Sequence, residues 1–256
     1  MLKIATWNVN SIRARLERAI AWLEKASPDI VCLQELKTSN ETFPYDEIHA
    51  AGYHAAVYGQ KTYNGVAILS RNEPTDVMVG LSDDVEDPQA RLIAARIDGV
   101  NVLSVYVPNG AVVDSDKWIY KLAWYKRLHR YLSRRYTPDD PLLLCGDFNI
   151  APDDRDVANP EKWAGSVICH ADGRASLQNL INWGLVDTLR LHHVEQGPYS
   201  WWDYRHLGFP KNDGLRIDHI LSTPAFAERC TDAMVDREER KGKKPSDHAP
   251  VLAFFE

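Results

Sequence analysis

The sequence lacks the features that mark several classes of protein. No apolar stretch approaches the roughly 20 residues that span a bilayer, and the start of the chain at 1–7 is too short for a secretory signal core. The four cysteines, Cys32, Cys145, Cys169 and Cys230, stand singly, so neither a disulfide framework nor a zinc-binding spacing is visible. We therefore expect a soluble protein of the cytoplasm that does not bind membranes.

Linkers, repeats and a net positive charge are missing as well. The chain contains no Gly/Ser-rich or Pro-rich linker and no low-complexity tract. Its formal net charge is -6, which argues against non-specific coating of nucleic acid, because such binding depends on Lys and Arg that neutralise phosphates. What is present is a 256-residue chain with 45% hydrophobic residues, enough for a large core. We expect a single domain over 1–256, acting as a monomer.

Apolar runs of strand length are interspersed irregularly with helical segments. Apolar residues spaced at three and four predict helices over 12–25 and 117–136, and a shorter helix is expected over 175–183. The first helix is expected to bury Leu16, Ile20 and Leu23. The strand-length runs are 4–9, 30–33, 65–69, 92–97, 100–107, 142–145, 217–221 and 251–255. The order fits no simple alternating barrel, so we expect an α/β fold of two sheets packed face to face with helices outside.

Polar residues of catalytic type recur where these apolar runs stop. Strand ends are the places where rigid elements present side chains to a cleft. Gly146-Asp147-Phe148-Asn149, for example, follows four apolar residues. The side chains at such ends are Asn8, Asn10, Gln34, Glu35, Tyr106, Asn109, Asp147, Asn149, Asp218, Asp247 and His248.

Each of these positions also has a structural explanation. Asn8 fits a strand-end turn, Glu35 fits a solvated acid at a helix start, and 246–248 fits a turn or a helix cap. Asp218 is harder to explain in this way, because a carboxylate flanked by Ile217 and Ile220 is costly unless it is paired.

The donor types at these strand ends indicate which metal they would suit. Oxygen ligands without clustered His or Cys favour Mg²⁺ or Mn²⁺ over zinc. The pair His192–His193 lacks such a context and is interpreted as exposed histidines at a helix end.

Taken together, the motifs resemble those of the exonuclease III/abasic-site (AP) endonuclease family of the endonuclease/exonuclease/phosphatase superfamily. They follow in the family's order along nearly the whole chain, which is more specific than any single motif. The family implies a four-layer α/β sandwich of two mixed β-sheets flanked by helices. The motifs are TWNVN at 6–10, LQELK at 33–37, NGVAI at 64–68, GDFN at 146–149, WGLVD at 183–187, YSWWDYR at 199–205, LRID at 215–218 and PSDHAPV at 245–251.

The resemblance implies a role for each strand-end residue. The implied metal ligands are Glu35, Asn8, Asn10 and Asp247, binding Mg²⁺ with Mn²⁺ as a substitute. The implied catalytic residues are Asp147, Asn149, His248, Asp218 and Tyr106. Whether Asp147 or the pair of His248 and Asp218 acts as the base is left open.

Further residues are expected to contact DNA. The segment 117–135 carries seven basic residues and no acid. Its C-terminal half is interpreted as a solvated helix face, since helix ends favour cations, whereas its first turns are candidates for DNA contact. Lys241, Lys243 and Lys244 either contact the DNA backbone or are solvent-exposed residues of a hairpin. The candidates for DNA contact are Asn109, Lys117, Lys121 and Arg91. Trp201 and Leu215 are candidates for the walls of a pocket that holds a sugar without a base. Trp202 is more typical of the core.

The expected activity is Mg²⁺-dependent hydrolysis of double-stranded DNA, 5′ to abasic sites and at 3′ ends, with exonuclease and 3′-phosphatase action. Two alternatives are a superfamily phosphatase or phosphodiesterase that acts on another phosphoester, and a non-catalytic DNA-binding relative. One departure from the family pattern, Asp172-Gly173-Arg174 where many relatives carry Glu-Arg, leaves the preference among DNA substrates open.

Overall fold

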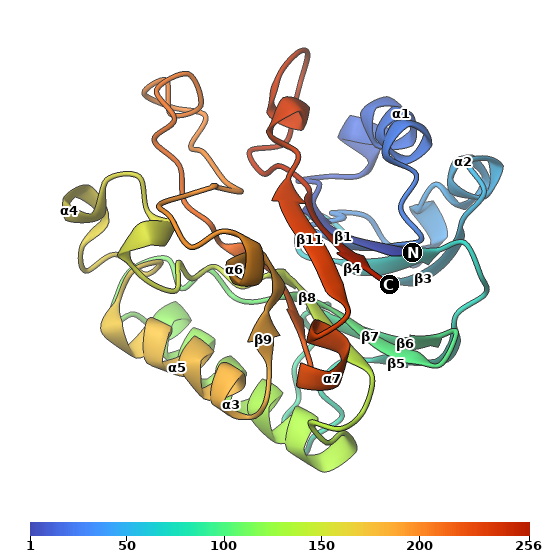
Figure 1. The fold of residues 1–256 in the computed structure, drawn as a ribbon, viewed down its shortest axis with the longest axis horizontal. Coiled ribbons are helices and arrows are strands. Elements are labelled where there is room, and N and C mark those ends of the chain that lie inside the picture. The colour runs from blue at the N-terminus through green and yellow to red at the C-terminus, as the bar shows by residue number, and fades with distance from the viewer.

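The computed structural model describes all of residues 1–256 as a sandwich of two six-stranded sheets (Figure 1). The first sheet has the order β11-β12-β1-β2-β4-β3 and the second the order β5-β6-β7-β8-β10-β9. Each sheet contains one parallel pair, β1 with β2 and β7 with β8, among antiparallel neighbours. Both sheets are therefore mixed, as expected.

The strands of the first sheet are β1 (Leu2–Asn8), β2 (Ile30–Gln34), β3 (His54–Tyr58), β4 (Val66–Ser70), β11 (Cys230–Val235) and β12 (Val251–Phe255). Those of the second are β5 (Thr75–Val79), β6 (Leu92–Ile97), β7 (Val100–Tyr106), β8 (Leu142–Asp147), β9 (Val186–Asp187) and β10 (Asp218–Ser222).

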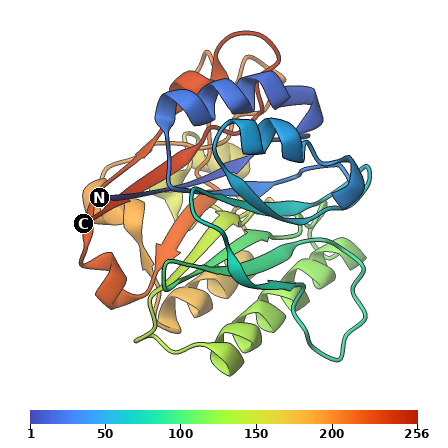
Figure 2. The same cartoon turned by 90° about the vertical axis from the view of Figure 1, so that its right-hand side faces the viewer.

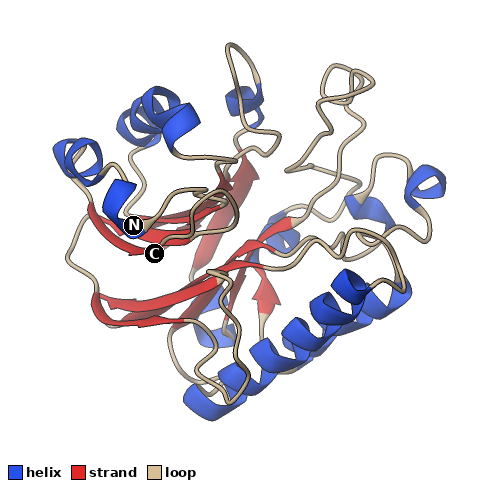
Figure 3. Cartoon of the chain, turned by 180° about the vertical axis from the view of Figure 1, so that it is seen from behind, coloured by secondary structure: helices blue, strands red, loops and turns tan.

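Helices cover the outer face of each sheet, which makes four layers (Figures 2 and 3). The helices α1 (Leu16–Ala26) and α2 (Tyr45–Ala50) pack on the first sheet, and α3 (Asp116–Arg135) and α5 (Ala171–Asn182) pack on the second. The shorter helices are α4 (Pro160–Trp163), α6 (Thr188–His192) and α7 (Pro224–Ala227). None of the helices is long and apolar enough to cross a membrane.

Strands buried on both faces explain the continuous apolar runs of the sequence. In β2, Ile30 and Cys32 point into the core between the sheets, whereas Val31 and Leu33 point into the core under α1 and α2. This alternation follows from the period of two along a strand. All four cysteines are free, and Cys32 and Cys145 are buried as small apolar side chains.

The predicted elements are confirmed with some corrections. The first helix buries Ala19, Trp22 and Leu23, whereas Leu16 and Ile20 are only half-buried. The helix expected from 175 begins at Ala171, where the ring of His170 accepts a hydrogen bond from the Asp172 N–H. The sequence did not predict β3, β5, β9 and β11, all four of which lie at sheet edges, where fewer residues are buried and the apolar signal is weak.

Candidate active site

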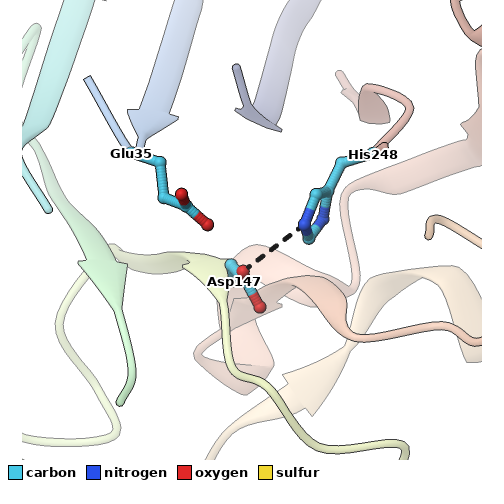
Figure 4. Close-up of side chains that lie close together, drawn as sticks. All are labelled: Glu35, Asp147 and His248. Carbon is cyan, nitrogen blue, oxygen red and sulfur yellow. Dashed lines mark ion pairs between the residues drawn. The ribbon is translucent and has the colours of Figure 1, made fainter. Parts of the chain in front are cut away.

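The candidate site lies where strands of both sheets end. The ends of β1 and β2 come from the first sheet, and those of β7 and β8 with the start of β10 come from the second. The strand register places Asn8 beside Gln34, and Asp147 opposite Asp218. Figure 4 shows Glu35, Asp147 and His248 pointing toward one another. The sandwich thus brings together residues that lie far apart in the sequence.

Several residues of the site have an unusual backbone. Asn10, Glu35 and Asn149 adopt left-handed conformations, with φ of 45°, 52° and 50°. For a residue other than glycine this costs about 1–2 kcal/mol, and such conformations concentrate at functional sites. Gly146, with φ of 156°, could not be replaced easily, because a Cβ there would lie 1.9 Å from the carbonyl oxygen of Val105. The backbone therefore aims the side chains at strand ends into a common space.

Asn8 joins the two central carboxylates. Its fully buried amide nitrogen donates at 2.9 Å to Glu35 Oε1 and at 2.9 Å to Asp147 Oδ2. Lys37 forms an ion pair with the other oxygen of Glu35 at 2.8 Å. Burial raises the pKa of Glu35, but Lys37 and the hydrogen bond from Asn8 outweigh burial, so that the pKa lies below its usual value. Glu35 is therefore ionised at neutral pH.

His248 and Asp218 form a buried pair. His248 Nδ1 lies 2.9 Å from Asp218 Oδ2, which also accepts a hydrogen bond from Ser200 Oγ at 2.6 Å. Burial lowers the pKa of His248, but Asp218 and Asp147 more than reverse this effect and hold the pKa well above its usual value. The other ring nitrogen, Nε2, lies 3.8 Å from Asp147 Oδ2 (Figure 4). His248 is therefore a charged donor that faces Asp147.

Asp147 is a buried carboxylate that lies between Asn8 and His248. Its Oδ1 accepts the backbone N–H of Asn149 at 2.9 Å. Burial raises its pKa, His248 opposes that rise, and the neighbouring carboxylates of Asp218 and Glu35 raise the pKa further. A carboxylate with a raised pKa has the basicity that proton abstraction requires.

A second cluster lies beside the first. Asn10 Nδ2 donates to Asp247 Oδ1 at 2.9 Å, and Trp201 Nε1 donates to Asp247 Oδ2 at 3.0 Å. Lys37 Nζ lies 2.6 Å from Asn10 Oδ1 and so connects the two clusters. Burial raises the pKa of Asp247, but His248, Trp201 and Asn10 together bring it below its usual value.

Three further predicted residues, Tyr106, Arg91 and Asn109, lie beside these groups. Burial, Glu35 and Asp147 raise the pKa of Tyr106 well above its usual value, so its hydroxyl keeps its proton. The guanidinium of Arg91 stacks 4.8 Å from the ring centre of Tyr106. Asn109 is exposed, and it donates at 3.0 Å to the side-chain oxygen of Asn149.

The donor atoms suit a hard cation at Glu35 and Asp147. Ligand atoms of Glu35, Asp147 and His248 all lie within 4.8 Å of one another. The protonated His248 cannot ligate, which leaves two carboxylates, the donors that Mg²⁺ and Mn²⁺ prefer. Asn8 presents its nitrogen to both carboxylates, since its oxygen accepts the Asn10 N–H at 3.0 Å. The predicted ligands Asn10 and Asp247 bond to each other in the second cluster.

Two of the DNA-binding predictions are wrong. Lys121 is fully buried and donates to backbone carbonyls, because α3 turns this residue inward. Leu215 is also fully buried, in a small apolar cluster with Val157 and Ile217, so it does not line an open pocket. Lys117 is exposed and Trp201 is half-buried, whereas Trp202 belongs to the core, as expected.

The structure also shows where the other basic residues and the paired histidines lie. Arg127 pairs with Asp83 and Asp87, which removes it from the basic surface. Lys241 pairs with Glu238, and Lys243 and Lys244 are exposed. His192 is exposed, and His193 Nε2 lies 2.8 Å from the carbonyl oxygen of Ala233.

Sequence reasoning missed three residues that shape the site. Ser200 binds Asp218 and also accepts the backbone N–H groups of Ile217 and Asp218 at 3.1 Å. Ser246 Oγ donates to the carbonyl oxygen of Asn8 at 2.7 Å and so ties the loop before His248 to β1. The sequence contained an indication that Lys37 belongs to the site, because it lies two positions after Glu35 in the same motif. Ser200 and Ser246 lie within the motifs at 199–205 and 245–251, but the sequence does not show which groups they bind.

Comparisons with known proteins agree with this geometry. The model of the endonuclease/exonuclease/phosphatase family matches residues 5–248. Exodeoxyribonuclease III from Haemophilus influenzae is 38% identical, with 99% of this chain and 100% of that protein covered. An AP endonuclease structure from Archaeoglobus fulgidus superposes with a TM-score of 0.97 at 45% identity, over 100% of both chains. A 3′ phosphatase from Neisseria bound to a product DNA hairpin superposes with a TM-score of 0.96 at 46% identity, again over 100% of both chains.

Proposed function

Because this chain belongs to the endonuclease/exonuclease/phosphatase family, and to its exonuclease III branch, we propose that it is a metal-dependent DNA repair nuclease. It hydrolyses the backbone of double-stranded DNA 5′ to abasic sites, and it acts at 3′ ends as an exonuclease and a phosphatase. Its relatives with solved structures are an AP endonuclease and a 3′ phosphatase, which supports both kinds of substrate. A monomeric state, a single domain over 1–256 and a cytoplasmic location stay predictions.

The observation that carries this proposal is the pairing of a basic carboxylate with a charged imidazole. Hydrolysis of a phosphodiester requires a positioned water, neutralised charge on the phosphoryl oxygens and help for the departing oxygen. Asp147, with its raised pKa, suits a general base that orients and deprotonates the water. His248 keeps its proton beside Asp218, so it donates from Nε2 to a phosphoryl oxygen instead of acting as the base.

The amides and the tyrosine complete the site. Asn149 and Asn109 lie side by side and have amide groups suited to contact the phosphate or the water. Tyr106 remains protonated, so it donates a hydrogen bond or a proton. Lys117, Arg91 and Trp201 stay candidates for DNA contact.

A divalent cation would supply further positive charge at the site. We propose that Glu35 holds Mg²⁺ beside Asp147, with Mn²⁺ as a substitute, and that Asn8 orients both carboxylates. A divalent cation held there would neutralise charge on the phosphate and stabilise the leaving oxygen. Asn10 and Asp247 stay candidates for a second metal position.

The test compares three labelled duplexes that carry an internal abasic-site analogue, a recessed 3′ end or a 3′-phosphate. We expect cleavage of all three with Mg²⁺, loss of cleavage with EDTA, and recovery when Mg²⁺ or Mn²⁺ is added back in excess. Ca²⁺ serves as a control for charge alone. Cleavage that persists in EDTA would contradict the roles of Glu35 and Asp147, and failure on all three duplexes would contradict the proposed function.

A further inference from the structure

Lys121 places a buried amino group directly behind the active-site loops, where burial lowers its pKa to about 7. Its side chain is fully buried on the inner face of α3. The three N–H donors of an ammonium group match three acceptors here, the backbone carbonyl oxygens of Asn109 at 3.1 Å, Asn149 at 2.7 Å and Val167 at 2.7 Å. The hydrogen-bonding capacity of Lys121 is thus fully used within the protein, and none is left for DNA.

The three carbonyl groups belong to three different segments. Asn109 lies in the loop between β7 and α3, Asn149 follows β8, and Val167 precedes α5. Asn149 adopts its left-handed conformation at the point where Lys121 binds it. A single side chain therefore sets the spacing of three loops that have no regular secondary structure to fix them.

Stability alone is a poor explanation for a charged group in this place. Burying an ammonium costs several kcal/mol, and apolar side chains of similar volume often stabilise a core as well or better than buried charges do. The hydrogen-bond partners of Lys121 are backbone carbonyl groups, with no carboxylate among them. Beyond packing, Lys121 supplies directed hydrogen bonds to three carbonyl groups. These bonds fix the geometry of the loops.

That geometry reaches the reacting groups through Asn149. The Asn149 backbone N–H binds Asp147 Oδ1 at 2.9 Å, and its side-chain nitrogen binds the carbonyl oxygen of Val107 at 2.9 Å. Its side-chain oxygen accepts from Asn109. A displacement of the Asn149 backbone would move Asp147 and both amide groups together.

The aliphatic part of the Lys121 side chain is closely packed against the loop after β7. A Cβ added at Gly110 would lie 3.0 Å from Lys121 Cδ and 3.2 Å from Trp118 Cε3. The backbone of the loop after β7 therefore rests on the Lys121 side chain without a gap.

We propose that Lys121 is a positioning residue for phosphodiester hydrolysis, which fixes the amide groups of Asn109 and Asn149 and the carboxylate of Asp147 relative to one another. The inference rests on the proposed nuclease function. Its effect should fall on kcat more than on KM, because Lys121 touches residues that act on the phosphate but does not touch the substrate.

The test replaces Lys121 by Met, which keeps the length of the stem and removes the donors. The rate is measured on the abasic-analogue duplex at saturating Mg²⁺. A misplacement of reacting groups by about 1 Å can cost about 100-fold in rate, so we expect kcat to fall by about 10-fold to 100-fold. KM should change by less than about threefold. Lys126→Met, at an exposed position of the same helix, is the matched control and should leave both constants unchanged.

A double-mutant cycle separates positioning from loss of stability. In an Asn149→Ala background, Lys121→Met should lower kcat by a smaller factor than in the wild type, because the side-chain amide of Asn149 is gone while the backbone connection from Lys121 to Asp147 remains. An equal loss in both backgrounds, or wild-type kcat in Lys121→Met, would overturn the inference. If Lys121→Met does not fold, Lys121→Gln, which retains two N–H donors, is measured in the same cycle and judged by the same outcomes. An inactive wild-type protein would instead overturn the proposed function.

Discussion

One hydrogen bond decides what His248 does in the proposed reaction. Asp218 accepts from Nδ1 at 2.9 Å, and this bond fixes the tautomer and favours the charged ring. Asp218 Oδ1 is buried and has no hydrogen-bond partner, so the carboxylate faces mainly His248 and Ser200. The His248 ring therefore presents a fixed positive charge to Asp147.

Replacing Asp218 by Asn tests this charge through its pH dependence. The wild-type pKa of His248 is raised, so the ring stays protonated across the neutral range. Without the Asp218 charge the pKa falls toward about 6.5, and the ring loses its proton as the pH rises through that value. We expect kcat of Asp218→Asn at pH 8 to be about 100-fold below wild type, with part of the loss recovered near pH 6. A titration of His248 by NMR measures the pKa directly, and an unchanged pKa would refute the explanation.

The site residues differ in how far the sequence could predict them. Glu35, Asp147 and His248 were predictable, because each follows or precedes an apolar strand run in a recognisable motif. The inward orientation of Lys121 was not, because a run of basic residues predicts an exposed helix face and the sequence does not show which turn packs against the loops. Ser200 was missed since its partner, Asp218, is contacted only after folding.

At the scale of elements, a buried network of charges supports the loops behind the site. Arg216, at the entry to β10, binds Asp156 and Asp187, and its Nη1 lies 3.0 Å from His219 Nδ1. His219 Nε2 in turn lies 3.1 Å from the carbonyl oxygen of Ile150, in the loop after Asn149. Burial and the Arg216 charge lower the pKa of His219 to about 4, so the ring stays neutral.

Asp156→Asn should destabilise the fold in a pH-dependent way. Burial raises the pKa of Asp156, but Arg216 and Arg190 outweigh burial and lower the pKa to about 2. A lowered pKa adds stability that is present above the unfolded value near 4 and is lost as the pH falls toward 2. We expect Asp156→Asn to lose about 3–5 kcal/mol at pH 7. The difference from wild type should narrow by about 2 kcal/mol near pH 2. Urea unfolding at both pH values measures this, and a constant difference would contradict the role of the charge.

Gly146→Ala should disrupt the parallel pairing of β7 with β8. The added Cβ would lie 1.9 Å from the Val105 carbonyl oxygen, so the strands must separate just before Asp147. We expect a loss of about 3 kcal/mol in unfolding free energy. Gly99→Ala is the control, because Gly99 also has a positive φ but has no atom within 4 Å of its added Cβ. Equal losses in the two variants would mean that backbone conformation alone, and not the contact, is responsible.

Element prediction from the sequence succeeded where both faces of a strand are buried. β6 and β12 were predicted at their observed bounds, since continuous apolar runs leave little choice of boundary. β5 and β11 were missed, because these edge strands have several exposed residues and irregular registers. Each of these strands forms by pairing with a neighbouring strand, and its own residues do not show that pairing.

At the scale of the whole molecule, the site exists only because two sheets meet. Glu35 and Asn8 come from the first sheet, and Asp147 and Asp218 come from the second. The core between the sheets contains Ile4, Cys32, Val102 and Cys145, whose strands lead directly to the site. Loosening that core would separate the carboxylates before it unfolded the chain.

In the proposed reaction, Asp147 performs the chemistry on DNA that the rest of the site binds. The most direct test measures the cleavage rate and the Kd of Asp147→Asn and of the wild type on the abasic-analogue duplex. We predict that the wild type cleaves, that the variant is about 1,000-fold slower, and that both bind with a Kd within about threefold. Wild-type turnover by Asp147→Asn would contradict the account, and so would a loss of cleavage explained entirely by a loss of binding.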